Sequence, residues 1–241
     1  MNFLLKKSTL AITLSAALLL SACEKTVQAV VTPAAPVAAQ TSTTQTAPAP
    51  TNFDTAGFNI VEGKDYIRLQ NPQPVQTAGQ SDVLEFFWYG CPHCNTIDPA
   101  VQAWKKTIPA SVKFIRIHPS WGAHMEVHQK TFYTLQALNK NDVMDEKVIN
   151  ALHSQQLALN TPESVSDFMA QNGIAKADWD SAYKSFGVST EVGKAGTLFA
   201  AYGLQGVPAF IVNGKYQVSG DSARVLKVVN KLLEMDAGAK K

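Results

Sequence analysis

The pattern of apolar and polar residues predicts a small set of strands around one central strand. Residues 83–89 form a nearly continuous apolar, aromatic-rich run of strand length, which is typical of a strand buried on both faces of a sheet. Alternation over residues 65–70 predicts a first strand, and residues 112–117 predict a third. The sequence therefore indicates a sheet built around residues 83–89.

A hairpin is predicted closer to the C-terminus. Two short apolar runs, residues 210–212 and residues 216–218, flank Asn213 and Gly214. Asn-Gly between two such runs is the strongest short-range hairpin signal, because both residues tolerate the left-handed backbone that the turn needs. We therefore expect two neighbouring antiparallel strands here.

Helical spacing dominates the long segment between the third strand and the hairpin. From about residue 121 to about residue 202, apolar residues recur at helical intervals, for example at Phe132, Leu135 and Leu138. A compact domain rarely uses a connection of this length as a loop, so the segment predicts an inserted helical subdomain. A last amphipathic helix, at about residues 222–236, is expected to cover the sheet.

A Cys-Pro-His-Cys motif follows the central strand. Because proline is favoured at the first position of a helix, Pro92 predicts that Cys91 lies at a helix N-terminus. The N–H groups and dipole there favour a thiolate by up to about 2 kcal/mol in good geometry. His93 can add a charge or an N–H, and Cys94 is near enough to close a small disulfide ring. The motif predicts a redox-active pair whose reduced form is stabilised, which makes its disulfide oxidising.

Two cysteines at this spacing can also form half of a metal site. A structural zinc site needs four ligands, usually with a second pair at similar spacing, but the third cysteine, Cys23, lies in a different kind of segment. His118, His124 and His128 do not follow the motif at the spacing that zinc fingers use. His124 and His128 lie four residues apart but lack the glutamate directly after the first histidine. We expect them on an ordinary helix surface and expect no metal.

The cysteine motif, the strand at residues 84–87 and the later segment at residues 206–216 resemble the DsbA family, the thioredoxin-fold thiol oxidases of the bacterial periplasm. The resemblance covers the chain from about residue 66 to the C-terminus. It implies an α/β, thioredoxin-like fold with an inserted helical subdomain. It also implies that Pro208 is cis and faces the cysteines, so that the Val207 backbone can pair with an extended substrate strand.

Three charged residues are singled out by the same resemblance. Glu85, Asp98 and Arg116 occupy positions where it implies charges beneath the disulfide. A carboxylate in an otherwise apolar strand needs a reason, because burial of an unpaired charge is costly. These residues either relay protons and adjust the pKa of Cys94 or form a structural ion pair, and the sequence does not decide between the two.

The first 22 residues predict an export signal. Two lysines precede an apolar run at residues 10–20, which is too short to span a bilayer at about 20 residues per helix. Residues 20–23 resemble the lipobox of bacterial lipoproteins, in which cleavage precedes a cysteine that becomes lipid-modified. Cys23 is then a membrane anchor, since several acyl chains hold firmly where one binds only marginally. The alternative is an ordinary cleavage site with a chance cysteine.

Residues 23–52 are dominated by Ala, Pro, Thr, Gln and Val and cannot bury enough apolar surface to fold. We interpret them as a disordered tether with a reach of about 30 Å, followed by one domain at residues 53–241. Without the two lysines of the signal, 19 of the 21 basic residues remain against 19 acidic residues. This balance leaves no excess of positive charge of the kind that binds nucleic acid.

These features predict a monomeric, membrane-anchored thiol:disulfide oxidase of the periplasm that needs no cofactor besides its own disulfide. The resemblance implies that it donates the disulfide of Cys91 and Cys94 to cysteine pairs of newly exported polypeptides. It also implies reoxidation by a DsbB-like, quinone-linked membrane oxidase. The alternatives are a disulfide isomerase or reductase, a metal-binding lipoprotein that uses Cys91, Cys94 and a histidine, and a non-catalytic binding lipoprotein.

Overall fold

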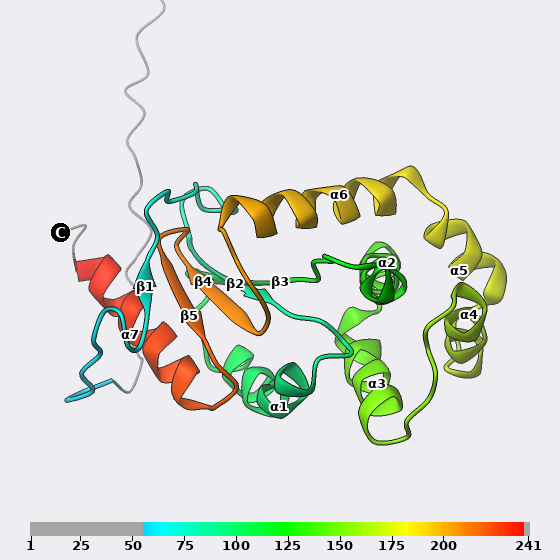
Figure 1. Ribbon diagram of the computed structural model, residues 1–241, viewed down its shortest axis with the longest axis horizontal. Helices are drawn as coiled ribbons and strands as arrows, with labels where there is room; N and C mark the ends of the chain where they lie inside the picture. Colours follow the sequence, from blue (N-terminus) through cyan, green and yellow to red (C-terminus); the bar gives the residue numbers. More distant parts are fainter. Residues whose placement is uncertain (1–54, 239–241) are drawn as a thin grey trace, which may run out of the picture. The chain divides into compact units, whose positions relative to one another are not determined.

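A mixed five-stranded sheet is the framework of the computed structural model, which describes residues 55–238 (Figure 1). The predicted export signal, the tether and Cys23 lie outside the described residues. The strands are β1 (Ile67–Arg68), β2 (Ser81–Phe86), β3 (Val112–Ile117), β4 (Ala209–Val212) and β5 (Tyr216–Ser219). Their order is β1-β5-β4-β2-β3, with β2 and β3 parallel and the other neighbours antiparallel.

The helices confirm the predicted insertion. They are α1 (Pro92–Lys105), α2 (Ala123–Ala137), α3 (Asn141–His153), α4 (Pro162–Gln171), α5 (Lys176–Tyr183), α6 (Phe186–Ala201) and α7 (Arg224–Gly238). Helices α2 to α6 lie between β3 and β4 in the sequence, and α6 leads back from α4 and α5 to the start of β4 (Figure 1). Within residues 55–238, no helix combines the length and apolar character needed to cross a membrane.

The central strand β2 is buried on both faces, as predicted. Because side chains alternate along a strand, neighbouring residues of β2 enter two different hydrophobic clusters. Val83 packs with Phe210 and with residues of α1 and α7. Leu84 and Phe86 point to the other face and pack with residues of the helical insertion. The sheet is therefore the common wall of both clusters.

β2 ends at Phe86, three residues before the end of the predicted strand. The Phe87 N–H still donates to the last carbonyl of β3, at 3.0 Å, but Trp88 and Tyr89 no longer pair with a strand. Their apolar character has a different cause, because Tyr89 is buried against Phe132 of the insertion. Residues 87–90 thus form the connection that carries the chain from the sheet to the cysteine motif.

β1 is also shorter than the strand predicted at residues 65–70. Only Ile67 and Arg68 pair with β5. The preceding residues are held in a local turn, in which the Gly63 N–H donates to the Tyr66 carbonyl at 2.8 Å. The alternating pattern therefore overestimated the length of this edge strand.

The hairpin between β4 and β5 is confirmed. Asn213 and Gly214 both have positive φ angles, 50° and 65°, as its turn requires. A Cβ atom on Gly214 would lie 1.9 Å from the carbonyl oxygen of Gln73. Only glycine fits at this position, because the neighbouring chain passes directly over it.

Candidate active site

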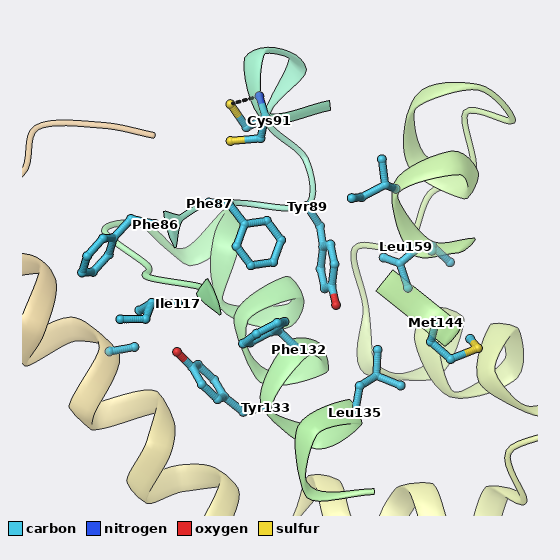
Figure 2. Close-up of a cluster of buried hydrophobic side chains, with 14 of the residues drawn as sticks. Phe86, Phe87, Tyr89, Cys91, Ile117, Phe132, Tyr133, Leu135, Met144 and Leu159 are labelled. Carbon is cyan, nitrogen blue, oxygen red and sulfur yellow. Dashed lines mark hydrogen bonds between the residues drawn. The ribbon is translucent and has the colours of Figure 1, made fainter. Parts of the chain in front are cut away.

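Cys91 is the N-cap residue of α1, as the sequence predicted. Its backbone is extended, Pro92 occupies the first turn, and its sulfur accepts a hydrogen bond from the Cys94 N–H at 3.3 Å. Figure 2 shows this hydrogen bond as a dashed line above the buried rings of Phe87 and Tyr89. The sulfur is therefore held against the end of the helix where a negative charge is favoured.

Both cysteines of the motif are free and largely covered. Cys91 is 6% exposed and Cys94 is 3% exposed. The connection before Cys91 and the loop at Val207 both pack around its sulfur. The difference in exposure between the two sulfurs is small, so what distinguishes them is their electrostatic environment.

The surroundings of Cys91 lower the pKa of its thiol to about 6. The largest contribution is a hydrogen bond from the Cys94 side chain. Backbone N–H groups of Cys94 and His93 and the charge of His93 act in the same direction, against the effect of burial. The sequence predicted the downward direction from the helix N-terminus and His93, but it did not predict that the Cys94 side chain would be the main donor.

The pKa values of the two cysteines shift in opposite directions. The hydrogen bond to Cys91 raises the pKa of Cys94, and burial adds to this effect. One proton is therefore held by Cys94 while Cys91 is ionised. Pairs of titratable groups whose pKa values are pushed apart in this way mark the acid and the nucleophile of a site.

The loop before β4 lies next to Cys91. The peptide bond between Val207 and Pro208 is cis, as the family resemblance implies. The Val207 carbonyl lies 3.6 Å from the Cys91 sulfur, close enough to accept a weak hydrogen bond from its thiol. Within residues 55–238, the Val207 N–H has no hydrogen-bond partner.

A groove of about 440 Å³ opens beside this loop. His93 and Asp221 line it together with Val207 and Pro208. His93 Nδ1 lies 2.7 Å from Asp221 Oδ2, and this contact raises the pKa of His93. Asp221 was not singled out from the sequence, because it follows β5 in the chain and reaches His93 only through the fold.

Arg116 brings together the three charged residues that the resemblance indicated. The parallel register places Glu85 opposite Arg116, and their Oε2 and Nε atoms lie 2.7 Å apart. Arg116 Nη2 donates to Asp98 Oδ1 at 2.7 Å. A third carboxylate, Asp145 of α3, lies 3.4 Å from Nη1 and was not predicted. The guanidinium also covers the Phe87 ring, 3.9 Å from its centroid.

This buried network contains more carboxylates than cations. Burial raises the pKa of Glu85 and that of Asp145, and the charge of Arg116 opposes the shift in both. Within residues 55–238, Glu85 Oε1 has no hydrogen-bond partner. The charge of Glu85 also contributes to the raised pKa of Cys94, so the network and the redox pair are electrostatically linked.

The prediction that His124 and His128 share a helix surface was wrong for His128. His124 is exposed, but His128 is buried and accepts a hydrogen bond from Trp88 Nε1 at 2.9 Å. The face of α2 that carries His128 packs against the connection before the cysteine motif, which the helical spacing alone does not show. Within residues 55–238, no three His, Cys, Asp or Glu side chains are grouped so that they could hold a metal ion.

The fold and the site together define a dithiol oxidoreductase of the thioredoxin fold. A cysteine caps the first helix after a central strand, a second cysteine lies one turn further, and a cis proline adjoins them. The DSBA-like thioredoxin domain family matches residues 104–230. The chain belongs to the DsbA family of thiol:disulfide oxidoreductases.

Individual relatives support this assignment over most of the domain. The chain is 37% identical over 183 residues to the thiol:disulfide interchange protein DsbA of Pseudomonas aeruginosa, covering 74% of this chain and 87% of that protein. It is 35% identical over 185 residues to the protein of the same name from Azotobacter vinelandii, covering 75% and 86%. The crystal structure of Pseudomonas aeruginosa DsbA superimposes with a TM-score of 0.71 at 38% identity, covering 76% of this chain and 97% of that one.

Proposed function

We propose that this chain donates the disulfide of Cys91 and Cys94 to cysteine pairs of newly exported polypeptides in the periplasm. The observation that carries the proposal is the Cys91 sulfur, which caps α1 and has a pKa lowered to about 6. A stabilised thiolate favours the reduced state of the pair. The disulfide state is correspondingly a strong oxidant.

The exchange proceeds in two displacements. A substrate thiolate attacks the Cys91 sulfur, the bond between Cys91 and Cys94 breaks, and Cys94 leaves with the electron pair and takes up a proton. A second substrate thiolate then attacks the substrate sulfur of the mixed disulfide, and Cys91 leaves as a thiolate. The substrate loses two electrons and two thiol protons, and the enzyme gains the two electrons.

The raised pKa of Cys94 supports this order of events. A leaving Cys94 thiolate is buried and is destabilised beside Glu85, so it is protonated once it forms. Cys91 is the opposite case, because N–H groups and the Cys94 thiol stabilise its thiolate as it leaves the substrate. Glu85, Asp98 and Arg116 contribute here by setting the charge beneath Cys94.

The Val207 loop and the adjoining groove receive the substrate chain. The unpaired Val207 N–H offers a backbone donor to an extended segment, the way an added strand pairs with a sheet edge. His93 and Pro208 line the same groove. A substrate segment bound there has its cysteine next to Cys91, because the Val207 carbonyl lies within 3.6 Å of that sulfur.

The protein acts as a monomer held at a membrane through lipid-modified Cys23. The tether at residues 23–52 lets the domain at residues 53–241 reach about 30 Å from its anchor. Reoxidation is carried out by a DsbB-like, quinone-linked membrane oxidase, which removes the two electrons from the reduced pair. The proposal is supported by the apolar run and the lipobox-like residues at the start of the chain.

The redox proposal is tested with the oxidised protein and a reduced, unfolded polypeptide that contains two cysteines. The wild-type protein is expected to form the substrate disulfide and to become a dithiol in equal amount, as measured by thiol-specific mass labelling. Cys91→Ser and Cys94→Ser serve as controls, because neither variant holds a disulfide to donate. A wild-type protein that leaves the substrate reduced contradicts the proposal, and faster repair of a scrambled substrate than oxidation of a reduced one identifies an isomerase instead.

The anchor is tested separately in exported protein. The mature wild-type protein is expected to carry an acyl mass increment and to sediment with membranes, whereas Cys23→Ser is expected in the soluble fraction with unchanged redox activity. A wild-type protein without the increment contradicts the lipoprotein part of the proposal. Zinc or copper titration of the reduced protein addresses the metal-binding alternative, which requires tight stoichiometric binding.

A further inference from the structure

Trp88, in the connection before the cysteine motif, interacts with both of its cysteines. The Cys91 N–H donates to the Trp88 carbonyl at 3.0 Å, and the Trp88 backbone acts on the Cys94 thiol by lowering its pKa, against the effect of burial. Residues 88–89, termed here the pre-cysteine segment, pair with no strand. Their position therefore depends on contacts with other parts of the fold, and the position of the Cys91 backbone depends on theirs.

Three histidines bind this segment directly. The Tyr89 N–H donates to His118 Nε2 at 3.2 Å, and His153 Nε2 donates to the Tyr89 carbonyl at 2.8 Å. The Trp88 side chain donates to His128 Nδ1 at 2.9 Å. Both backbone polar groups of Tyr89 are thus satisfied by imidazoles, although Tyr89 itself is fully buried.

The second nitrogens of His118 and His128 fix their donor and acceptor roles. His118 Nδ1 lies 3.1 Å from the Pro119 carbonyl, and His128 Nε2 lies 2.9 Å from the Leu159 carbonyl. A carbonyl only accepts, so each ring carries its proton on that side and presents a bare nitrogen to the pre-cysteine segment. Burial lowers the pKa of His118 to about 3 and also lowers that of His128, which keeps both rings neutral and this pattern intact.

Most of these contacts come from the helical insertion. His128 lies on α2, and His153 is the last residue of α3. A fourth contact has the same origin, because the Tyr89 hydroxyl donates to Asp145 of α3 at 2.5 Å. Figure 2 shows the Tyr89 ring extending from the chain near Cys91 toward the part of the insertion that carries Phe132 and Met144.

We infer that His118, His128 and His153 are positioning residues for thiol:disulfide exchange. Through them, β3 and the helical insertion hold the pre-cysteine segment and so keep the Cys91 sulfur against the N–H groups of α1. The inference rests on the role proposed for Cys91. It gives the helical insertion a role in positioning Cys91, although the two displacements of the exchange reaction involve no residue of the insertion.

The hydrogen bonds that hold the pre-cysteine segment favour the reduced state of the cysteine pair for a physical reason. Hydrogen bonds to a thiolate are roughly twice as strong as those to a neutral sulfur, so misalignment of the N–H groups costs the thiolate more than it costs the disulfide. Loosening the pre-cysteine segment is therefore expected to make the pair less oxidising. A residue that only stabilised the fold would not shift the balance between the two redox states.

His153 is the best residue for the test, because it is only half-buried and ends its helix. His153→Leu removes the N–H and keeps an apolar side chain of similar bulk, whereas His153→Gln keeps an N–H near the position of Nε2. Lys147→Ala, at an exposed position of the same helix, is the matched control. His153→Ala replaces the leucine variant if that variant does not fold.

The measurements are the redox equilibrium with glutathione and the pH dependence of thiolate absorbance, both on folded protein. His153→Leu is expected to shift the equilibrium about threefold to tenfold toward the disulfide, as loss of a partly buried hydrogen bond implies, and to raise the midpoint of thiolate formation. His153→Gln is expected to restore most of both values, and Lys147→Ala to leave them at the wild-type level. The inference is overturned if His153→Leu matches wild type, or if His153→Gln is no better than His153→Leu.

Failure of the proposed function gives a different result. If the wild-type thiolate forms only near the pH of an ordinary cysteine, the role of Cys91 is wrong whatever the histidine variants do. If the wild-type midpoint is low and His153→Leu leaves it unchanged, only the inference about the histidines fails.

Discussion

The carbonyl oxygen of Val207 lies 3.6 Å from the sulfur of Cys91, although 116 positions separate the two residues in the chain. The whole helical insertion lies between them in sequence. The sheet closes this distance, because β2 leads into Cys91 and the antiparallel β4 begins just after Pro208. The cysteine proposed to be attacked and the loop proposed to receive the substrate are therefore held by neighbouring strands.

The first prediction concerns stability against pH. The folded pKa of Cys91 is about 6, below the value of about 8.5 for a free thiol. The folded reduced protein thus binds fewer protons than the unfolded chain between these values, and its free energy of unfolding rises with pH there by up to about 1.4 kcal/mol per pH unit. This stabilisation is lost as the pH falls through about 6.

The comparison uses urea unfolding of the reduced and oxidised forms across this window. The oxidised form is the control, since its disulfide does not titrate. As the pH rises from 6 to 8, the free energy of unfolding of the reduced form is expected to increase relative to that of the oxidised form. A difference in the free energy of unfolding that stays constant over this range would count against a stabilised Cys91 thiolate.

The second prediction concerns the buried arginine. Arg116→Leu removes the cation that pairs with Glu85 and Asp98 and leaves their carboxyl groups buried without it. Breaking a buried ion pair from one side costs about 3–5 kcal/mol, so the free energy of unfolding is expected to fall by this amount. Chemical denaturation at neutral pH measures it.

Lys105→Ala is the control for this variant, because Lys105 and Asp142 form an ion pair at the surface. Such pairs are worth about 0–1 kcal/mol. The two variants separate burial from charge pairing as the source of the effect. A loss of under about 1 kcal/mol in Arg116→Leu would mean that the carboxylates are solvated or protonated at little cost.

The third prediction concerns His93. Its contact with Asp221 raises the pKa of the imidazole, so Asp221→Asn is expected to lower the pH at which His93 loses its charge. Less positive charge then remains beside Cys91 at neutral pH, and the thiolate is expected to form at a slightly higher pH. Nuclear magnetic resonance titration of the His93 ring protons measures the first effect directly.

Asp167→Asn is a suitable control, because Asp167 pairs with Lys176 in the insertion and not with a histidine. It is expected to leave the His93 titration unchanged. An unshifted His93 midpoint in Asp221→Asn would show that the contact does not persist in solution.

The sequence predicted those parts of the fold and site that depend on neighbouring residues. Pro92 after Cys91 indicated the helix start, and Asn213-Gly214 indicated the hairpin, because each pattern acts within a single turn. The insertion was visible from its length and its helical spacing. The position of Glu85, Asp98 and Arg116 in one network followed from the family resemblance, and the structure places them together.

The residues that the sequence missed act across long distances in the chain. Asp145, His153 and Asp221 reach the site only after the insertion and the C-terminal strands have packed. His128 was misplaced because the spacing of two histidines on a helix does not show which face is covered. The end of β2 was placed too late because residues 88–89 are apolar for packing against helices, a signal that a buried strand also gives.

The Cys91 thiolate is proposed to be stabilised at the N-terminus of α1, and the thiolate absorbance of the reduced protein as a function of pH tests this stabilisation. Cys91→Ser supplies the baseline. The wild-type protein is expected to show a thiolate transition near pH 6 that is missing from Cys91→Ser. A single transition near pH 8.5, the value of an ordinary thiol, would contradict the account.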